Sequence, residues 1–407
     1  MATLKYWLWL TTRQGMNARQ RLMILDHFGT PETAYFADPA EYDLTPSLTP
    51  RGRKSLEDKS LDSAEHILEA CQRLGIRILT LQDAGYPERL RQIFDPPAVL
   101  YVRGRTVAFD EEVAIGMVGS RAPSVYGEKM AGKLGFEVAR GGGLVVSGIA
   151  RGLDSCALVG ALKGGGTVAA VLGCGIDVVY PPENHWLYED VAASGLLISE
   201  YPPGTEPTGF HFPIRNRILS GLCLGVVAVE AALHSGTLIT TRLALEQDRD
   251  LFAVPGNADA PMSRGTNRLI QQGAGLVTCG WDILGEYQSQ FPDKIRAPGG
   301  EPLAEEAVRL TVSHPEPLRE QERKQKTIDK IPEEAYIELD MEKSGIPEEQ
   351  WELLQTLDEK PLTADELVEL TQIPAGRVRS ALTLLQIQGY VEELPGRRFQ
   401  TKVRLRE

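Results

Sequence analysis

Residues 113–154 decide the fold, and they read VAIGMVGSRAPSVYGEKMAGKLGFEVARGGGLVVSGIARGLD. Two short apolar runs, Val113–Val118 and Leu144–Ser147, enclose a segment of helical length, Val125–Arg140. Strands that are apolar throughout are typical of a parallel sheet buried on both faces, whereas alternating strands are typical of a half-exposed sheet. This strand–helix–strand unit therefore predicts a parallel sheet with helices on both faces.

The same alternation continues to about residue 287. Five further short apolar runs follow along the chain: Thr167–Leu172, Leu196–Ser199, Val226–Val229, Leu251–Val254 and Leu276–Thr278. Segments of helical length, such as Gly152–Lys163 and Gly236–Arg249, separate most of them. We therefore expect residues 111–287 to form one doubly wound α/β domain.

Residues 1–110 have a different pattern and predict a helical domain with a connector. Met16–His27, Thr30–Ala37 and Ser60–Leu74 carry apolar residues at helical spacing. The Phe-Gly-Thr-Pro turn at residues 28–31 resembles those of helix-hairpin-helix or SAM-like modules. The alternative is a small helical cap that binds no partner, which would show the same pattern.

Residues 288–345 predict an acidic linker. Residues 301–360 contain 17 acidic and 8 basic side chains, a net charge of −9 against −13 for the whole chain. Proline and glutamate dominate this stretch, which disfavours a packed core. The whole-chain charge argues against a purely electrostatic nucleic-acid binder, but most of the acidity lies outside the α/β segment.

Residues 346–407 predict a winged helix. Glu348–Leu357 has a helical pattern, and Thr363–Glu366 is a capping box that begins a second helix ending at Thr371. A third helix is expected at Arg377–Gln388, and the Pro-Gly-Arg-Arg turn at 395–398 indicates a hairpin. The third helix of such a module often reads a DNA groove, but residues 361–407 hold 7 basic and 6 acidic side chains, so we expect little attraction for DNA here.

The composition is that of an ordinary globular protein. A chain of 407 residues should hold two or three domains at about 100–200 residues each. Hydrophobic residues make up 42% and charged residues 24%, which excludes global disorder, a collagen-like repeat and a small disulfide scaffold.

The remaining exclusions concern metals, disulfides and membranes. The five cysteines form no C-x-x-C pair and the six histidines no H-E-x-x-H, so we expect no disulfide, no metal and no cofactor. The N-terminal apolar run turns polar at Thr11, which is too short to cross a bilayer, and no cleavage site follows it. We expect a cytoplasmic protein without membrane contact.

Glycines, hydroxyl side chains and arginines gather where the predicted strands end. In open α/β sheets ligands bind outside the carboxyl ends of the strands. Glycine lets a phosphate approach the backbone, hydroxyls and helix N-termini donate hydrogen bonds, and arginine binds phosphate with two donors. The candidate phosphate-binding residues are Gly119, Ser120, Arg121, Ser147, Gly148, Arg151, Gly173, Gly175, Arg215, Asn216, Arg217, Ser235, Gly236, Thr237 and Asn267.

So many such residues on one rim predict a phosphate track rather than a single nucleotide pocket. The alternative is that the glycines serve tight turns and the arginines pair with Glu200, Glu230 or Asp154.

Three motifs that would indicate a nucleotide-binding or catalytic site are absent or stand in the wrong context. The G-x-G-x-x-A match at Gly164–Ala169 follows a helix rather than a strand, and neither G-x-x-x-x-G-K-[ST] nor G-x-S-x-G occurs.

The ordered set of rim motifs resembles the DNA-processing protein A family, DprA/Smf. The resemblance covers roughly residues 85 to 282. The motifs are Val118–Arg121, Ser147–Asp154, Val171–Gly175 with Tyr180-Pro181, Ser199–Gly204, Phe212–Arg217, Glu230–Thr240, Phe252–Gly256 and Gly265–Ile270. The helical front and the winged-helix tail also resemble a common layout of this family.

The resemblance implies an extended Rossmann-like domain that binds single-stranded DNA in a basic pocket, self-associates as a homodimer and loads RecA recombinase. It implies a role in natural transformation and recombination, and no catalysis. By motif, Arg121 would hold a DNA phosphate, and the other rim residues would shape the pocket. Leu158 and His185 depart from the family pattern, which usually has histidine at the first position and a basic residue near the second, so one pocket cation is expected to be missing.

Two other classes of function remain open. A Rossmann-like enzyme acting on a nucleotide or phosphorylated nucleoside would need Glu200 or Glu230 as a general base. A winged-helix regulator with an α/β sensor domain is the third class. Nucleotide turnover would favour the enzyme, and sequence-specific binding of duplex DNA would favour the regulator.

Overall fold

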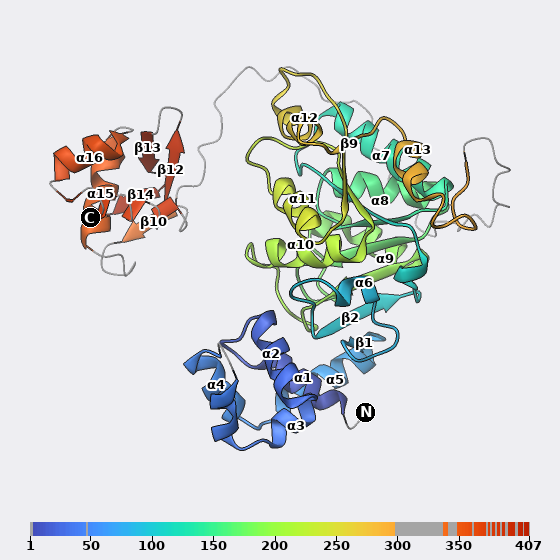
Figure 1. The fold of residues 1–407 in the computed structure, drawn as a ribbon, viewed down its shortest axis with the longest axis horizontal. Coiled ribbons are helices and arrows are strands. Elements are labelled where there is room, and N and C mark those ends of the chain that lie inside the picture. The colour runs from blue at the N-terminus through green and yellow to red at the C-terminus, as the bar shows by residue number, and fades with distance from the viewer. Residues whose placement is uncertain are drawn as a thin grey trace. The chain divides into compact units, whose positions relative to one another are not determined.

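The computed structural model describes residues 3–45 and 48–297, and beyond them residues 337–340, 348–359, 362–371 and parts of 373–406. The chain divides into two compact units, Met1–Ser313 and His314–Glu407. The first unit contains a helical part followed by the α/β part (Figure 1).

The α/β part is built on a nine-stranded sheet with the strand order β1-β2-β6-β5-β4-β3-β7-β8-β9. The strands are β1 (Arg77–Thr80), β2 (Val99–Gly104), β3 (Ala114–Val118), β4 (Leu144–Ser147), β5 (Val168–Leu172), β6 (Leu196–Ser199), β7 (Gly225–Ala228), β8 (Asp250–Ala253) and β9 (Gly275–Leu276). Strands β3 to β9 run parallel, and β2 and β1 extend one edge antiparallel. The chain winds outward from β3 in both directions, so the predicted doubly wound parallel sheet is confirmed, with its switch point between β3 and β7.

Two helical layers cover the sheet (Figure 1). One layer holds α7 (Val125–Arg140), α8 (Leu153–Lys163), α9 (His185–Ser194) and α13 (Trp281–Leu284), and the other holds α6 (Glu88–Arg91), α10 (His211–Leu222), α11 (Thr237–Glu246) and α12 (Arg264–Gln271). Successive side chains of a strand point to opposite faces. In β3, Ile115 and Met117 therefore pack in the core under α7 and α8, and Ala114 and Val118 in the core under α10.

Helices α7 and α8 cross closely because glycines lie where they touch. A Cβ atom at Gly135 would collide with the carbonyl oxygen of Ala157, and one at Gly160 would collide with that of Gly132. This close crossing fixes the loops that precede the two helices, and both loops reach the same rim of the sheet.

The N-terminal part is helical, as predicted. Its helices are α1 (Leu4–Thr12), α2 (Ala18–Phe28), α3 (Pro31–Phe36), the 3₁₀ turn η1 (Pro39–Leu44), α4 (Pro50–Glu57) and α5 (Asp62–Leu74). A capping box formed by Asn17 and Gln20 begins α2. Trp7 and Trp9 of α1 belong to the same buried core as Val99 and Tyr101 of β2. The helical part therefore packs directly against the antiparallel edge of the sheet.

Residues 77–104, which the sequence pattern grouped with the helical segment, contribute β1 and β2 to the sheet. The helical part ends with α5 at Leu74, and the sheet begins at Arg77, before the expected boundary at residue 110. No helix in the described part of the chain combines the length and the apolarity that a membrane crossing requires.

The second unit contains the helices and strands of a winged helix. These are β10 (Ile337–Asp340), α15 (Glu348–Glu359), β11 (Leu362–Thr363), α16 (Ala364–Thr371), β12 (Val391–Leu394), β13 (Arg398–Thr401) and β14 (Val403–Arg406). The capping box before α16 is present, because the Thr363 N–H donates to Glu366 Oε2 at 2.7 Å and the Glu366 N–H donates to Thr363 Oγ1 at 3.2 Å. Strands β12 and β13 pair antiparallel, as a hairpin requires.

Parts of two predictions lie outside the described residues. In the expected third helix, the described residues 377–378, 381–382 and 385–386 are helical. Most of the expected linker, 288–345, also lies outside them. Its described part includes β10, which pairs parallel with β14 and which the sequence pattern did not indicate.

Candidate phosphate-binding site

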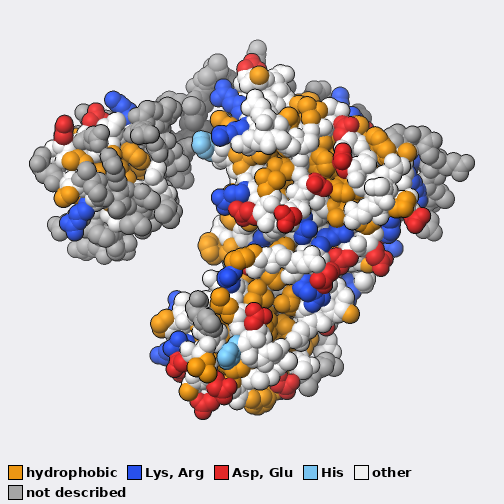
Figure 2. Space-filling view, in the orientation of Figure 1, with side chains coloured by type: hydrophobic (Ala, Val, Ile, Leu, Met, Phe, Trp, Pro, Cys, Tyr) orange, Lys and Arg blue, Asp and Glu red, His pale blue; other side chains and the backbone are white. Residues whose placement is uncertain are grey.

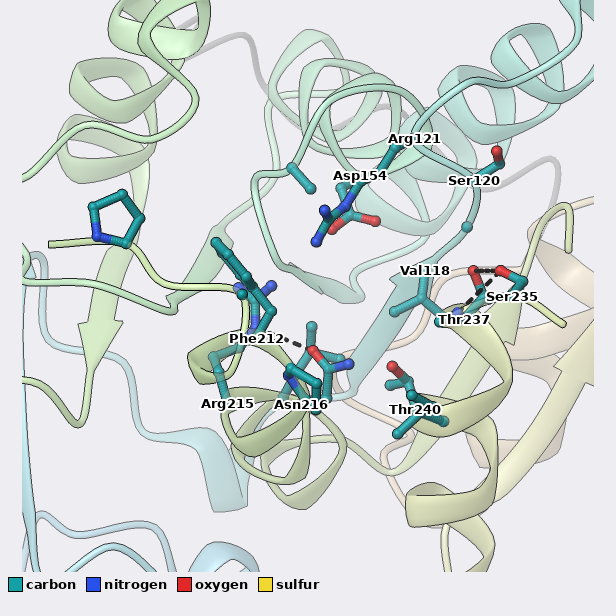
Figure 3. A pocket seen from close by; sticks show the side chains of 18 of the residues that line it. Val118, Ser120, Arg121, Asp154, Phe212, Arg215, Asn216, Ser235, Thr237 and Thr240 are labelled. Atoms are coloured by element: carbon teal, nitrogen blue, oxygen red, sulfur yellow. Dashed lines mark hydrogen bonds between the residues drawn. The ribbon is translucent and has the colours of Figure 1, made fainter. Parts of the chain in front are cut away.

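A pocket of about 470 Å³ lies at the switch point of the sheet, where the loops after β3 and β7 diverge (Figure 3). Four segments supply most of its lining: the loop after β3 with Gly119–Arg121, Ala150 and Asp154 after β4, the first turns of α10 with Phe212–Asn216, and the beginning of α11 with Ser235–Thr237. Eight of the predicted phosphate-binding residues therefore line one pocket: Gly119, Ser120, Arg121, Arg215, Asn216, Ser235, Gly236 and Thr237.

Arg121 is the exposed cation of this pocket. Its guanidinium carbon lies 5.1 Å from the centre of the Phe212 ring, and Figure 3 shows the side chain reaching from the loop after β3 over the pocket. Within the described residues Arg121 makes no ion pair, although the carboxylate of Asp154 in the same pocket lies near enough to feel its charge. An exposed arginine stacked on an aromatic ring keeps its donors free for an anion.

Arg215 is buried and holds the loop after β4. Its Nη1 donates to the carbonyl oxygen of Gly148 at 3.0 Å and to that of Val171, and its Nε donates to Asn216 Oδ1 at 3.2 Å. Burial lowers the pKa of Arg215, while the carboxylate of Asp154 opposes this shift. Arg215 therefore shapes the floor of the pocket first, and contributes positive charge to it second.

Asp154 is a buried carboxylate whose charge acts on Arg215. Burial raises the pKa of its carboxyl, and Arg215 and the N–H groups of the loop act in the other direction. Asp154 Oδ2 accepts the Gly148 N–H at 3.2 Å, which ties the first turn of α8 to the loop that precedes it.

The loop after β4 has a strained backbone. Ile149 has φ = 53°, a left-handed conformation that is unfavourable for a β-branched residue. Asn184 holds it there, because its Nδ2 donates to the Ile149 carbonyl at 2.9 Å and to Ser155 Oγ at 2.8 Å. Strained backbone of this kind concentrates at ligand-binding sites. Asn184 is not among the predicted site residues; only its position in the segment after Tyr180-Pro181 could have indicated it.

The N-termini of α7 and α11 differ in whether a carboxylate of the chain caps them. Before α7, the carboxylate of Glu230 accepts both the N–H of Ser124, at 3.0 Å, and the Ser124 hydroxyl, so an internal anion already occupies that helix end. At α11, Ser235 Oγ accepts the Thr237 N–H at 3.1 Å and donates to Thr237 Oγ1 at 3.0 Å. The beginning of α11 lines the pocket, and among the hydrogen bonds of the described residues its cap is a hydroxyl rather than a carboxylate.

Aromatic side chains form one wall of the pocket. The rings of Phe212 and Tyr180 lie 5.4 Å apart and are inclined by 34°. Gly173 is required here, because a Cβ atom at that position would lie 2.9 Å from Cδ1 of Phe212. Tyr180 is a lining residue that the candidate set omitted, although it stands in one of the quoted motifs.

Arg151 and Gly148 line a small hollow that adjoins the pocket and shares Arg121, Tyr180 and Phe212 with it. Arg151 is exposed and forms an ion pair with Glu183. This exposed pair is weak in water, so Arg151 remains able to exchange its partner for another anion.

The remaining candidates lie outside the pocket lining. Arg217 is 4% exposed and pairs with Asp95 at 3.1 Å and with Glu200 at 2.8 Å. Asn267 exchanges hydrogen bonds with the backbone of Gly256. The other two are close to internal backbone: the Ser147 hydroxyl donates to Met117 O at 2.7 Å, and Gly175 packs beside Pro202 and Gly204.

Of the two departures from the family pattern, Leu158 lies in the core and His185 is exposed at the beginning of α9.

Comparison with known proteins matches both units. The profile of a family described as DNA recombination-mediator protein A matches residues 77–288, and that of a DprA winged helix domain matches residues 341–397. The chain is 31% identical to Protein Smf of Synechocystis over 410 residues, which covers 98% of each chain. It is 43% identical to the DNA processing protein DprA of Streptococcus pneumoniae over 51% of this chain and 73% of that one.

Solved structures are also similar. The X-ray structure of DNA processing protein A from Streptococcus pneumoniae superposes with a TM-score of 0.62 at 34% identity, covering 69% of this chain and 97% of that chain. A structure of DNA processing protein A from Helicobacter pylori, solved to describe its single-stranded DNA binding mode, has a TM-score of 0.47 at 30% identity and covers 54% of this chain and 97% of that chain.

Proposed function

Because the chain belongs to the DNA recombination-mediator protein A family, we propose that it binds single-stranded DNA in the pocket at the switch point of the sheet. In this proposal the protein is a recombination mediator and not an enzyme. The observation that carries the proposal is the exposed, unpaired Arg121, which stacks on Phe212 opposite the open beginning of α11.

The proposed contacts divide between phosphate and base. A phosphate lies between the Arg121 guanidinium and the donors at Ser235–Thr237, where charge and helix end act together. A base stacks on the wall formed by Phe212 and Tyr180. Bases inside a duplex are already stacked on each other, so this wall favours a single strand.

The enzyme alternative loses support from the positions of its two candidate bases. Glu230 caps α7 and is 2% exposed, and Glu200 is ion-paired with Arg217. A general base must reach the proton that it removes, and neither carboxylate is part of the lining of this pocket.

Partners and biological role rest on family membership. We propose that the chain self-associates as a homodimer, acts in the cytoplasm and helps RecA recombinase to load on the bound strand during DNA uptake and recombination.

RecA assembly on a strand that is already covered with single-strand-binding protein tests the proposed loading of RecA. The mediator should shorten the lag of RecA's DNA-dependent ATP hydrolysis, and an unchanged lag would contradict a loading role.

Filter binding with matched single- and double-stranded oligonucleotides tests the proposed function. We expect the single strand to bind more tightly at every salt concentration, because only its bases are free to stack. Equal or tighter binding of the duplex would contradict the proposal and favour the winged-helix regulator.

Binding should weaken with salt although the chain carries a net charge of −13. Arg217 is ion-paired and outside the pocket lining, whereas Arg121 and Arg215 line the pocket and Arg151 lines the adjoining hollow, so these three remain as phosphate partners. About three neutralised phosphates at roughly −0.7 each give a slope near −2 in a plot of log K against log salt. A slope of zero in the filter-binding series would show that these arginines serve structure alone.

Deleting residues 346–407 should leave the dissociation constant for single-stranded DNA essentially unchanged. The pocket residues all precede residue 241, and the tail belongs to a separate compact unit. Fluorescence anisotropy with a labelled oligonucleotide measures this, with the full chain as control. Loss of binding on truncation would place the site in the C-terminal unit.

A further inference from the structure

A second cavity, of about 480 Å³, lies between the N-terminal helices and the α/β part. Its walls come from the end of α1, the beginning of α2, strand β2, the segment after β6 and the first turns of α10. The two cavities lie on either side of the beginning of α10, because Phe212 and Pro213 line the first and Phe210 and Ile214 line the second. Figure 2 shows hydrophobic and basic side chains together around the hollow where the two parts meet.

Arg21 of α2 lines this cavity, and no partner for it is found among the described residues. Its buried Nε atom has no hydrogen-bond partner, and within the described residues its guanidinium makes no ion pair. Burial lowers the pKa of Arg21, and Glu200 only partly opposes this shift. A mostly buried cation without a partner destabilises a fold. The packing of the unit therefore gives no reason for an arginine here, whereas a bound acceptor would.

Two carboxylates on the same cavity decide what kind of acceptor fits. Asp95 and Glu200 line it and pair with Arg217. Glu200 uses Oε1 for Arg217, and its Oε2 makes no hydrogen bond within the described residues. The two arginines and two carboxylates cancel in charge, so a phosphate has no net attraction to this cavity. A neutral ligand that offers both an acceptor and N–H donors does fit.

We propose that this cavity takes one unstacked nucleobase, with guanine preferred. Guanine offers O6 and N7 to an arginine, the commonest base contact of that side chain, and its N1–H and N2–H groups match a carboxylate such as Glu200. Tyr201 lines the cavity, and Phe210, which is 76% exposed, offers a surface for stacking. The inference rests on the proposed function, since it draws the base from the strand held in the neighbouring pocket.

The experiment compares fluorescently labelled all-thymine oligonucleotides with the same oligonucleotides carrying one guanine at successive positions. At the best position, guanine should tighten binding to the full-length protein about fivefold or more, the effect of one two-donor base contact. Arg21→Met should remove that advantage and bring the two dissociation constants together. Arg19→Met is the matched control, because Arg19 lies on the same helix, carries the same charge, is exposed and is not part of the lining. It should keep the guanine preference.

Two further measurements test which groups of the base are contacted and whether the base must belong to a strand. Replacing the guanine by 7-deazaguanine or inosine should reduce the preference, because each removes one of the groups that Arg21 or Glu200 would contact. Free deoxyguanosine monophosphate, added as competitor, tests whether the cavity also binds the base without the strand. Competition without any guanine effect in the oligonucleotide would overturn the strand as the source of the base.

The outcomes distinguish this inference from the proposed function. If no oligonucleotide binds, the proposed function fails. If all-thymine strands bind in an Arg121-dependent way but guanine has no effect at any position, or if Arg21→Met leaves the guanine preference intact, the base site alone is overturned. A thermal unfolding measurement on Arg21→Met checks the fold, and removing an unpaired buried charge should not lower its midpoint.

Discussion

Arg121→Ala should weaken the binding of single-stranded DNA by about 1–3 kcal/mol, which is roughly 5- to 150-fold in dissociation constant. The side chain is exposed and makes no ion pair within the described residues, so the substitution removes a ligand contact without leaving an internal group unpaired. Arg121→Lys should recover part of the affinity, since lysine keeps the charge but loses the planar, two-donor geometry.

Anisotropy titrations at one fixed, low salt concentration measure this effect. Arg105→Ala is a suitable control, because Arg105 is also exposed but lies outside the pocket lining. It should bind DNA as the unsubstituted chain does. If Arg121→Ala is folded and its dissociation constant matches that of the control, Arg121 has no role in binding.

Arg217→Ala should lower the stability of the first unit by about 3 kcal/mol or more, because it leaves Asp95 and Glu200 in a mostly buried place without their cation. Burial acts to lower the pKa of Arg217, but Glu200 and Asp95 together raise it, which indicates a tightly held pair. Although Arg217 stands two residues from Arg215 in the same motif, we expect it to affect folding first and DNA only through the fold.

Thermal unfolding separates these effects. The unfolding midpoint of Arg217→Ala should fall by several degrees. The combined variant Arg217→Met, Asp95→Asn, Glu200→Gln should recover most of the loss, because neither position 95 nor position 200 then holds a carboxylate without its cation. An unchanged midpoint together with lost DNA affinity would instead make Arg217 a direct DNA contact.

Much of the sheet was predictable because its strands are buried on both faces. The seven apolar runs from Val113 to Thr278 correspond to β3–β9, and the predicted helix Val125–Arg140 coincides with α7. Strands β1 and β2 were missed. They pair antiparallel at the edge, and β2 finds its partner β6 about 95 residues later in the chain, a pairing that no local pattern indicates.

The site was predictable in part, and for a physical reason. Motifs that end parallel strands must meet at one rim, so the pattern brought Arg121, Arg215 and Ser235 to one pocket. It could not distinguish an exposed arginine from a paired one. The partner of Arg217, Asp95, lies 122 residues away in a segment without a motif. In the same way, Glu230 was a candidate base until its position at the N-terminus of α7 was known.

Hydrogen–deuterium exchange with and without an all-thymine oligonucleotide tests whether a single strand binds in the pocket at the switch point of the sheet. We expect slower exchange in three segments that contribute residues to the pocket, 119–124, 148–154 and 235–240, with no change in the described parts of residues 348–406. The same experiment on Arg121→Ala should show the protection lost at equal oligonucleotide concentration. Protection confined to the C-terminal unit, with the pocket segments unchanged, would contradict the account.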